Sequence, residues 1–323
     1  MKTGLWFDLR NPLEWRQDWS RVYGFALEIC EEAERQGIDS IWVTEHHLFD
    51  DGYLPQPLTF LAAVAARTRR VRLGTAVLLA PLRTPAQIAE EAAVVDILSG
   101  GRLDLGLGAG YRVPEFDLYG ADIKQRYVAL DGCASTLRRM WREGQVTPPP
   151  MQSTLPIWMG YGGPKGARRA GVMGEGLLSA DATLFPHYRQ GLIDGGHEVA
   201  IGRMAGGING WISDDPEADW PVVSQHLTHQ FASYRRYAVE GTQQPPPRPF
   251  DVDKARSRPM GQGGAMGYLL FATPQEAAVK IKAYTADAPV ETVFFWASIA
   301  GMTEQRVTRN VQTLCSKLRP LLV

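Results

Sequence analysis

The stretch Ile41–Leu48, which reads IWVTEHHL, decides how the rest of this chain is interpreted. Its first three residues form a short apolar run typical of a buried strand. The run changes at Thr44 into polar and ionisable side chains, Glu45, His46 and His47. In α/β proteins with parallel strands, reactive groups lie just beyond the carboxyl ends of the strands. The stretch therefore predicts a strand that delivers ionisable groups to a site, with a surface strand and a polar end as the alternative.

Strand patterns and helix patterns alternate on both sides of this stretch. The predicted strands are residues 4–9, 41–43, 71–79, 102–108, 156–159, 176–180, 204–212 and 292–296. Helix patterns, rather than hairpin turns, lie between them, so parallel strands with right-handed crossovers are expected. About eight such strands in 323 residues predict an α/β fold, a (β/α)8 TIM barrel with insertions forming a single domain over residues 1–323. An open, doubly wound sheet is the alternative.

Residues 241–267 interrupt this alternation, because they are polar and rich in proline and glycine. Such a composition predicts a loop insertion rather than another helix or strand. The insertion could act as a lid over the site, or it could be a passive linker.

Composition excludes several classes of function. The formal net charge of -1 gives no general attraction to nucleic acid or to an anionic membrane. No apolar run approaches the roughly 20 residues of a membrane span, and Asp8 and Arg10 interrupt the N-terminus too early for a signal peptide. The three cysteines lie far apart, with no zinc-binding spacing. A cytoplasmic protein without nucleic-acid or membrane partners is expected.

Two glycine-rich segments follow predicted strands and would lie at the same end of a barrel. The first, Gly106–Gly110, could admit a planar ring or a phosphate. It is not a dinucleotide fingerprint, because that motif would need glycine at Tyr111. The second, Gly160–Gly163, leads to Lys165 at a predicted helix start, which suits an anion, although a flexible turn is nearly as good an interpretation.

The adjacent histidines are candidate metal ligands, but neighbouring residues on a strand point to opposite faces. His46 and His47 therefore cannot easily bind one ion, and no further ligand set stands out, so no metal is expected. One histidine at the mouth of a barrel fits proton transfer or hydrogen bonding better.

The segments WVTEHH (42–47), RLGTAVLLAPLRTPAQIAEEAAVVDILSGGRLDLGLGAG (72–110) and LPIWMGYGG (155–163) together resemble the bacterial luciferase-like flavin monooxygenases. The resemblance covers residues 4 to about 176 and weakens afterwards. It implies a TIM barrel that binds reduced FMN as cosubstrate, delivered by a separate flavin reductase. Oxygen would add at the flavin C4a position, and the resulting C4a-peroxyflavin would oxidise a small organic substrate.

The resemblance also implies roles for individual residues. His46 corresponds to the family's catalytic histidine near the flavin, and Glu45 to the acidic residue that helps hold the site. Ala76 and Val77 fall where family members have a non-prolyl cis peptide against the flavin ring. The cofactor-binding residues expected in this chain are Phe7, Ala76, Val77, Ala109, Gly110, Gly160, Gly162, Gly163 and Lys165, the last three in the flavin-phosphate loop.

One departure from the family pattern concerns the phosphate site. Luciferase has a Cys-Arg pair where this chain has Gly108-Ala109, so one cation is missing and luminescence is not expected. Arg112 is a candidate substitute for that cation.

A two-component FMN monooxygenase is the first expectation for function. A deazaflavin (coenzyme F420)-dependent hydride-transfer oxidoreductase and a non-catalytic flavin-binding protein are the alternatives. A homodimer is expected by analogy, through helices of the first half. The aromatic residues near the expected mouth suggest an apolar or planar substrate, but they are equally ordinary core residues.

Overall fold

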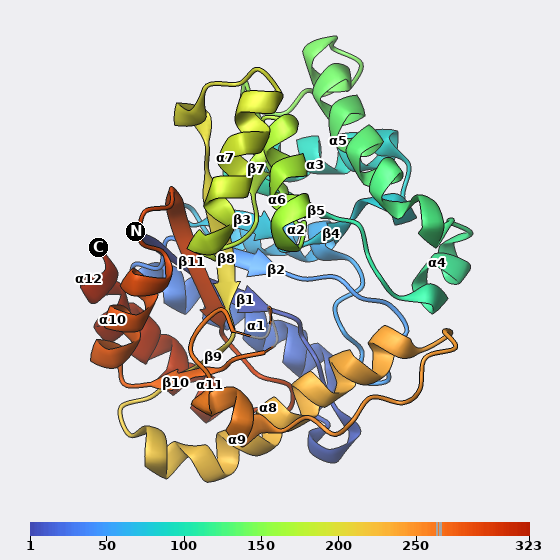
Figure 1. Cartoon of the computed structure of the whole chain (residues 1–323). Helices are drawn as coiled ribbons and strands as arrows, with labels where there is room; N and C mark the ends of the chain where they lie inside the picture. The colour runs from blue at the N-terminus through green and yellow to red at the C-terminus, as the bar shows by residue number, and fades with distance from the viewer. Residues whose placement is uncertain (263, 265–266) are drawn as a thin grey trace.

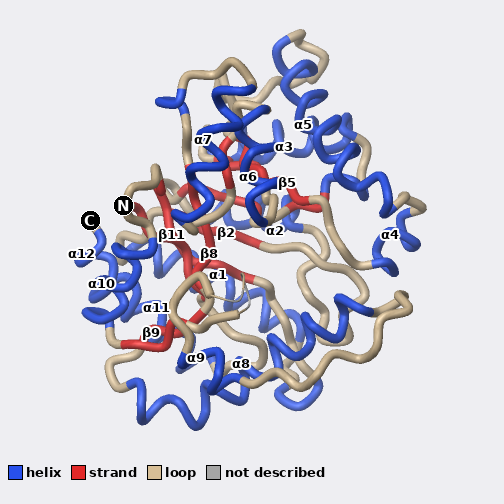
Figure 2. The backbone as a smooth tube through the Cα atoms, in the orientation of Figure 1, coloured by secondary structure: helices blue, strands red, loops and turns tan. Residues whose placement is uncertain are grey.

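A closed barrel of parallel strands forms the centre of the computed structural model, which describes residues 1–262, 264 and 267–323. Figure 2 shows the strands gathered at the centre with helices around them. The barrel strands are β1 (Lys2–Phe7), β2 (Ser40–Val43), β3 (Arg72–Thr75) with β4 (Leu78–Leu79), β5 (Leu103–Gly108), β6 (Ile157–Met159), β7 (Gly176–Leu177), β8 (Met204–Ile208) and β11 (Val290–Trp296). Pairing of Leu73 in β3 with Leu103 in β5 closes the barrel, which confirms the TIM-barrel prediction.

Two predicted strands are each divided. Residues 71–79 form β3 and β4, which are separated by a cis peptide between Ala76 and Val77 at the predicted position. Residues 204–212 form β8 in the barrel and β9 (Gly210–Ile212) outside it, where β9 pairs with β10 (Leu270–Ala272). Apolar composition predicted both segments correctly as extended, but composition does not reveal where the backbone leaves the sheet.

The helices between the strands pack on the outside of the barrel. They are α1 (Trp19–Arg35), α2 (Pro57–Arg67), α3 (Pro85–Ser99), α4 (Val113–Tyr119), α5 (Arg126–Arg142), α6 (Gly163–Val172), α7 (Phe185–Asp194), α10 (Pro274–Tyr284), α11 (Glu304–Thr313) and α12 (Arg319–Leu322). The short helix α4 was not predicted from the sequence. Among the described residues, no helix combines the length and apolar composition needed to cross a bilayer.

An insertion between β8 and β11 adds the long helix α8 (Pro216–Val239) and the short helix α9 (Val252–Ser257). Both lie together at the bottom of Figure 1, apart from the helices around α5 and α7. The prediction of a loop over 241–267 is therefore wrong for residues 252–257, where Asp251 caps a helix by accepting from the Lys254 N–H. Residues 263, 265 and 266 of that prediction lie outside the described residues.

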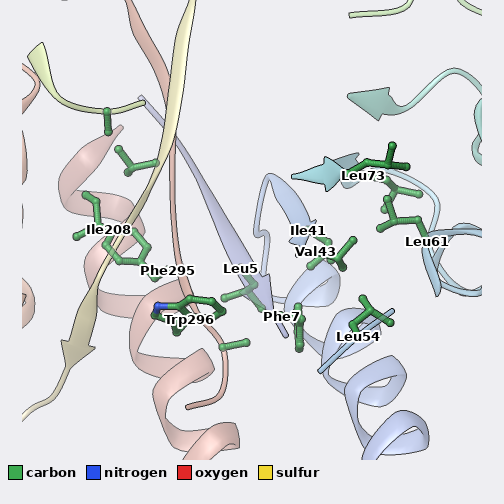
Figure 3. Packing of buried hydrophobic residues seen from close by; sticks show 14 of the residues in the cluster. Leu5, Phe7, Ile41, Val43, Leu54, Leu61, Leu73, Ile208, Phe295 and Trp296 are labelled. Carbon is green, nitrogen blue, oxygen red and sulfur yellow. The ribbon is translucent and has the colours of Figure 1, made fainter. Parts of the chain in front are cut away.

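Alternating side chains on the strands build two cores. Leu5, Ile41 and Phe295 belong to the large apolar cluster between the strands and the outer helices, part of which is seen in Figure 3. The intervening positions include Trp42 and Phe294, which stack with ring centroids 4.7 Å apart in the barrel interior. Period-two alternation thus fills the barrel with aromatic rings, and its outer face supplies the larger core.

Candidate functional site

A cavity of about 560 Å³ opens at the carboxyl ends of the strands. Its lining comes from β1, from the loops after β2, β5 and β6, from the β3–β4 junction, from the ends of β8 and β11, from the start of α5, and from one face of α8. The lining residues are Trp6, Thr44, Glu45, His46, Tyr53, Ala76, Val77, Leu79, Gly108, Ala109, Gly110, Tyr111, Tyr127, Gly160, Gly162, Asn209, Phe231, Tyr234, Ala238 and Trp296. This location at the carboxyl ends of barrel strands is where TIM barrels carry their active sites.

Small residues and Val77 form one wall, which we call the glycine wall: Ala76, Val77, Gly108–Gly110, Gly160 and Gly162. The Val77 side chain fills the space beside two glycines. A Cβ atom at Gly108 would lie 2.2 Å from Val77 Cγ2, and one at Gly160 would lie 2.5 Å from Val77 Cγ1. Both positions therefore favour glycine, because a Cβ atom at either one would force the Val77 side chain to shift.

Stacked tryptophans complete the lining beside the glycine wall. Trp6 and Trp296 lie with ring centroids 3.9 Å apart and nearly parallel planes. The Trp296 indole N–H donates to Asn209 Oδ1 at 3.0 Å. Trp6, rather than the predicted Phe7, lines the cavity; Phe7 faces the outer core, because neighbouring residues on a strand point to opposite sides.

His46 projects into the cavity from the loop after β2, in a fixed orientation. Its Nδ1 lies 2.7 Å from Glu115 Oε1, and its Nε2 lies 3.2 Å from the Tyr111 hydroxyl. When Glu115 is a carboxylate, Nδ1–H donates to it, and Nε2 then accepts from the Tyr111 hydroxyl, which also lines the cavity. His46 can accept a proton there, and Glu115 stabilises the positive charge that results.

Glu115 was not predicted from the sequence. It lies in α4, its side chain is fully buried, and the same oxygen accepts the His47 N–H at 2.9 Å. Its neighbour Arg112 is also buried, donating to the His47 carbonyl and pairing with Glu240 on the far side. The suggestion that Arg112 replaces a phosphate-binding cation is therefore wrong, because its guanidinium is already committed inside the protein.

Glu45 adjoins His46 in the chain but has a different environment. Its fully buried carboxylate accepts from the Leu79 N–H at 2.7 Å, from Arg83 Nη1 at 2.6 Å and from His47 Nε2 at 2.8 Å. Both oxygens are thus occupied by groups of the protein. The carboxylate ties the loop after β2 to the segment after the β3–β4 junction.

Three tyrosines surround His46 at the end of the cavity nearest α8. Tyr53, Tyr111 and Tyr234 form this tyrosine cluster, with ring centroids 4.8, 5.3 and 5.9 Å from the His46 ring. The Tyr53 and Tyr234 hydroxyls lie 2.7 Å apart and share a hydrogen bond. None of the three is among the catalytic or cofactor-binding residues predicted from the sequence.

Buried charges lie behind the tyrosine cluster. Arg10 pairs with Asp51, its Nε donating to Oδ2 at 2.7 Å, and its guanidinium carbon lies 5.4 Å from the Tyr234 ring centroid. Asp8 is buried beside them, and burial raises the pKa of its carboxyl to about 7 despite the opposing effect of Arg10. Burial also raises the pKa values of Tyr53 and Tyr234, so both hydroxyls stay neutral at physiological pH.

The start of α6 offers a site for an anion next to the glycine wall. Gly162 lines the cavity and occupies the N-cap position of α6 without a side-chain cap. Gly163 and Lys165 follow it in the first turn, and both are exposed. Uncapped backbone N–H groups, the positive end of a ten-residue helix and a nearby ammonium suit one phosphate group.

Residues 2–291 match the family model described as luciferase-like monooxygenase. The chain belongs to this family. The match extends well beyond the segments that carry the sequence resemblance, and it includes α8 and the strand β10.

Individual relatives within the family differ in their cofactors. An F420-dependent glucose-6-phosphate dehydrogenase of Amycolatopsis mediterranei is 32% identical over 47% of this chain and 52% of its own length. The oxygenase component of a flavin-dependent trigonelline monooxygenase of Acinetobacter baylyi is 33% identical over 39% of this chain and 36% of its own. This chain thus spans about half or less of the length of these two relatives.

A similar solved structure is that of the monooxygenase RslO1 from Streptomyces bottropensis. It superposes with a TM-score of 0.80 at 23% identity and covers 100% of both chains. At that identity the likeness establishes the fold alone. The family to which the chain belongs thus includes one relative named as F420-dependent and another named as flavin-dependent.

Proposed function

We propose that this chain is the oxygenase of a two-component monooxygenase, which uses reduced FMN and O2 to oxidise a small organic substrate. The observation that carries the proposal is the cavity itself, which is lined both by His46 and by a wall of small residues that reaches Gly162 at the start of α6. A wall of small residues leaves room for a planar ring system, and the adjoining anion site suits one phosphate group. FMN combines these two features.

The chain's own residues divide the work as follows. The glycine wall and Val77 support the ring system, and the first turn of α6 with Lys165 holds the phosphate. His46, oriented by Glu115, donates to or accepts from the reacting oxygen, and Glu45 holds the loops in place. Bound reduced FMN supplies two electrons for the activation of O2, whereas bound deazaflavin would accept a hydride.

Hydride transfer to a deazaflavin is the second candidate, and the pairing of His46 with Glu115 favours it. An imidazole whose other nitrogen bonds a buried carboxylate is a good acceptor for the proton that an alcohol loses during its oxidation. The name of the Amycolatopsis relative agrees with this chemistry. The relative from Acinetobacter, named as an oxygenase component, instead supports the first candidate and a separate reductase partner.

Titration of the purified protein with FMN, reduced FMN and the deazaflavin, followed by measurement of oxygen consumption, tests the proposal. Preferential binding of reduced FMN, with oxygen consumed on aeration, supports the monooxygenase. Preferential binding of the deazaflavin without oxygen consumption would establish the second candidate. Binding of FMN without any turnover would identify a non-catalytic flavin-binding protein.

The segment 241–267 is proposed as a lid over the bound cofactor. Phe250 in this segment stacks on Phe231, which lines the cavity, with ring centroids 5.0 Å apart. Movement of Phe231 when a ligand enters the cavity would therefore shift Phe250 and the segment that carries it. Limited proteolysis with and without FMN tests the idea: protection supports a lid, and unchanged cleavage contradicts it.

A homodimer is proposed through the helices of the first half. Three apolar side chains of α3, Val94, Ile97 and Leu98, are exposed on the protomer, and a second copy would cover them. Light scattering coupled to size exclusion measures the mass, and a monomer at micromolar concentration would contradict the proposal.

A further inference from the structure

The tyrosine cluster forms a polar but uncharged end of the cavity, opposite in character to the anion site at α6. The Tyr53 and Tyr234 hydroxyls are 2.7 Å apart, and the Tyr111 hydroxyl is 3.2 Å from His46 Nε2. Phe231 and Ala238 of α8 add apolar surface beside them. A ligand at this end would meet aromatic faces together with hydroxyl oxygens and the one hydroxyl proton that the Tyr53–Tyr234 pair leaves over.

Cations are absent from this end among the described residues that line the cavity: the lining contains no lysine and no arginine. Two arginines lie behind it, but acidic partners already neutralise them. Arg10 is paired with Asp51, and Arg112 is paired with Glu240. Neither guanidinium is available to an anion that enters the cavity.

A phosphorylated substrate would therefore be desolvated at this end without a compensating positive charge. Transfer of a doubly charged group into such surroundings is strongly unfavourable, and Glu115 and Asp8 nearby would add repulsion when they are ionised. A neutral ring with one oxygen substituent meets no such penalty. It can stack on the aromatic side chains while its oxygen bonds to a tyrosine hydroxyl or to His46.

Resting on the proposal that the glycine wall holds the flavin, we infer that the tyrosine cluster selects an uncharged, planar ring compound carrying a hydroxyl or carbonyl oxygen, and excludes sugar phosphates. This substrate class differs from that in the name of the Amycolatopsis relative, which acts on glucose 6-phosphate. Tyr234 is the specificity-determining residue, because it comes from the insertion helix α8 and its hydroxyl faces that of Tyr53.

A matched set of probes tests this inference by isothermal titration calorimetry on the protein loaded with FMN. The probes are 2-naphthol, 2-naphthyl phosphate and glucose 6-phosphate; the first two share the same ring, and the second carries a charged phosphate group on its oxygen. We expect 2-naphthol to bind at least about tenfold more tightly than its phosphate ester, and glucose 6-phosphate to give no binding heat. Equal or tighter binding of either phosphate would overturn the inference.

Variants that each lack one tyrosine hydroxyl show whether 2-naphthol binds at the tyrosine cluster. Tyr234→Phe should weaken 2-naphthol by about three- to tenfold, which is the usual effect of one hydrogen bond. Tyr23→Phe removes a hydroxyl from α1, where the ring packs on Phe60 outside the cavity, and it should leave binding unchanged. Equal effects of the two variants, or none from either, would overturn the role of Tyr234.

The FMN titration is a separate readout. If neither FMN nor the deazaflavin binds, the proposed function fails, and the comparison of Tyr234→Phe with Tyr23→Phe on the free protein still decides the role of the tyrosine cluster. If FMN binds but the probe order is reversed, the inference alone fails.

Discussion

Replacement of Glu45 by alanine should destabilise the fold far more than an ordinary loss of a surface carboxylate. The Glu45 side chain is fully buried, and it accepts hydrogen bonds from the Leu79 N–H, Arg83 and His47. The alanine variant leaves all three donors without this acceptor. The Arg83 side chain is only 3% exposed, so water cannot readily replace the lost charge.

The magnitude follows from the type of interaction. Removal of one partner of a buried ion pair typically costs about 3–5 kcal/mol, because the other charge is left uncompensated. Arg83 keeps a hydrogen bond to Gln56 Oε1 at 3.3 Å, which offsets part of this cost, so we expect a loss of about 4 kcal/mol. Glu45→Gln keeps an oxygen for the Leu79 N–H but loses the charge, and it should cost about half as much.

Urea unfolding followed by tryptophan fluorescence measures these losses as changes in the free energy of unfolding. Glu291→Ala is the matched control, because Glu291 pairs with Arg203 at 3.1 Å and both side chains are about 40% exposed, at 43% and 39%. Such a pair contributes about 0–1 kcal/mol. If Glu45→Ala costs no more than Glu291→Ala, the carboxylate does not hold the loops, and a direct role toward the bound ligand would replace the positioning role.

Three further predictions concern the cofactor, the reaction and pH. His46→Ala should still bind FMN but oxidise substrate about 100-fold more slowly, releasing hydrogen peroxide; unchanged coupling of oxygen consumption to product would remove His46 from catalysis. Lys165→Ala should weaken FMN about threefold and leave riboflavin unaffected in fluorescence titrations, and equal weakening of both would place the phosphate elsewhere. Because the folded-state pKa of Asp8 is about 7 against an ordinary 3.8, the unfolded chain releases this proton first, so Asp8 lowers stability as pH rises from about 4 to about 7. Asp8→Asn should therefore be more stable than wild type by as much as about 4 kcal/mol at pH 8 and about 2 kcal/mol at pH 5 in urea unfolding; an advantage that does not change with pH would contradict this account.

The alternation of strands and helices could be predicted from the sequence because its signals are local. Each strand is a short apolar run followed by polar or glycine residues, and helix patterns separate most of the runs. Closure could not be predicted, since it depends on the pairing of Leu73 with Leu103, and nothing in either segment specifies its partner across the sheet. The same holds for β9, whose partner β10 lies beyond the whole α8–α9 insertion.

Some residues of the candidate site could likewise be predicted from the sequence, and others could not. His46 and the two glycine segments could be recognised from the sequence, because their residue types stand directly after predicted strands. Glu115 does not, because it lies 69 residues from His46 on a short helix and only the folded chain brings the two together. Tyr234 looks like an ordinary apolar position of a long helix, and the misplacement of Phe7 by one residue follows from not knowing which face of β1 looks inward.

The origin of the cavity walls has a consequence for how such a protein can change. The glycine wall comes from the barrel strands themselves, where substitutions at Gly108 or Gly160 collide with Val77. Phe231, Tyr234 and Ala238 belong instead to the helix α8, which is not part of the barrel sheet. In the proposed function, the wall that holds the cofactor and the α8 side chains that contact the substrate are therefore under separate constraints. A few substitutions along α8 could therefore change which compound is bound, while the glycine wall stays unchanged.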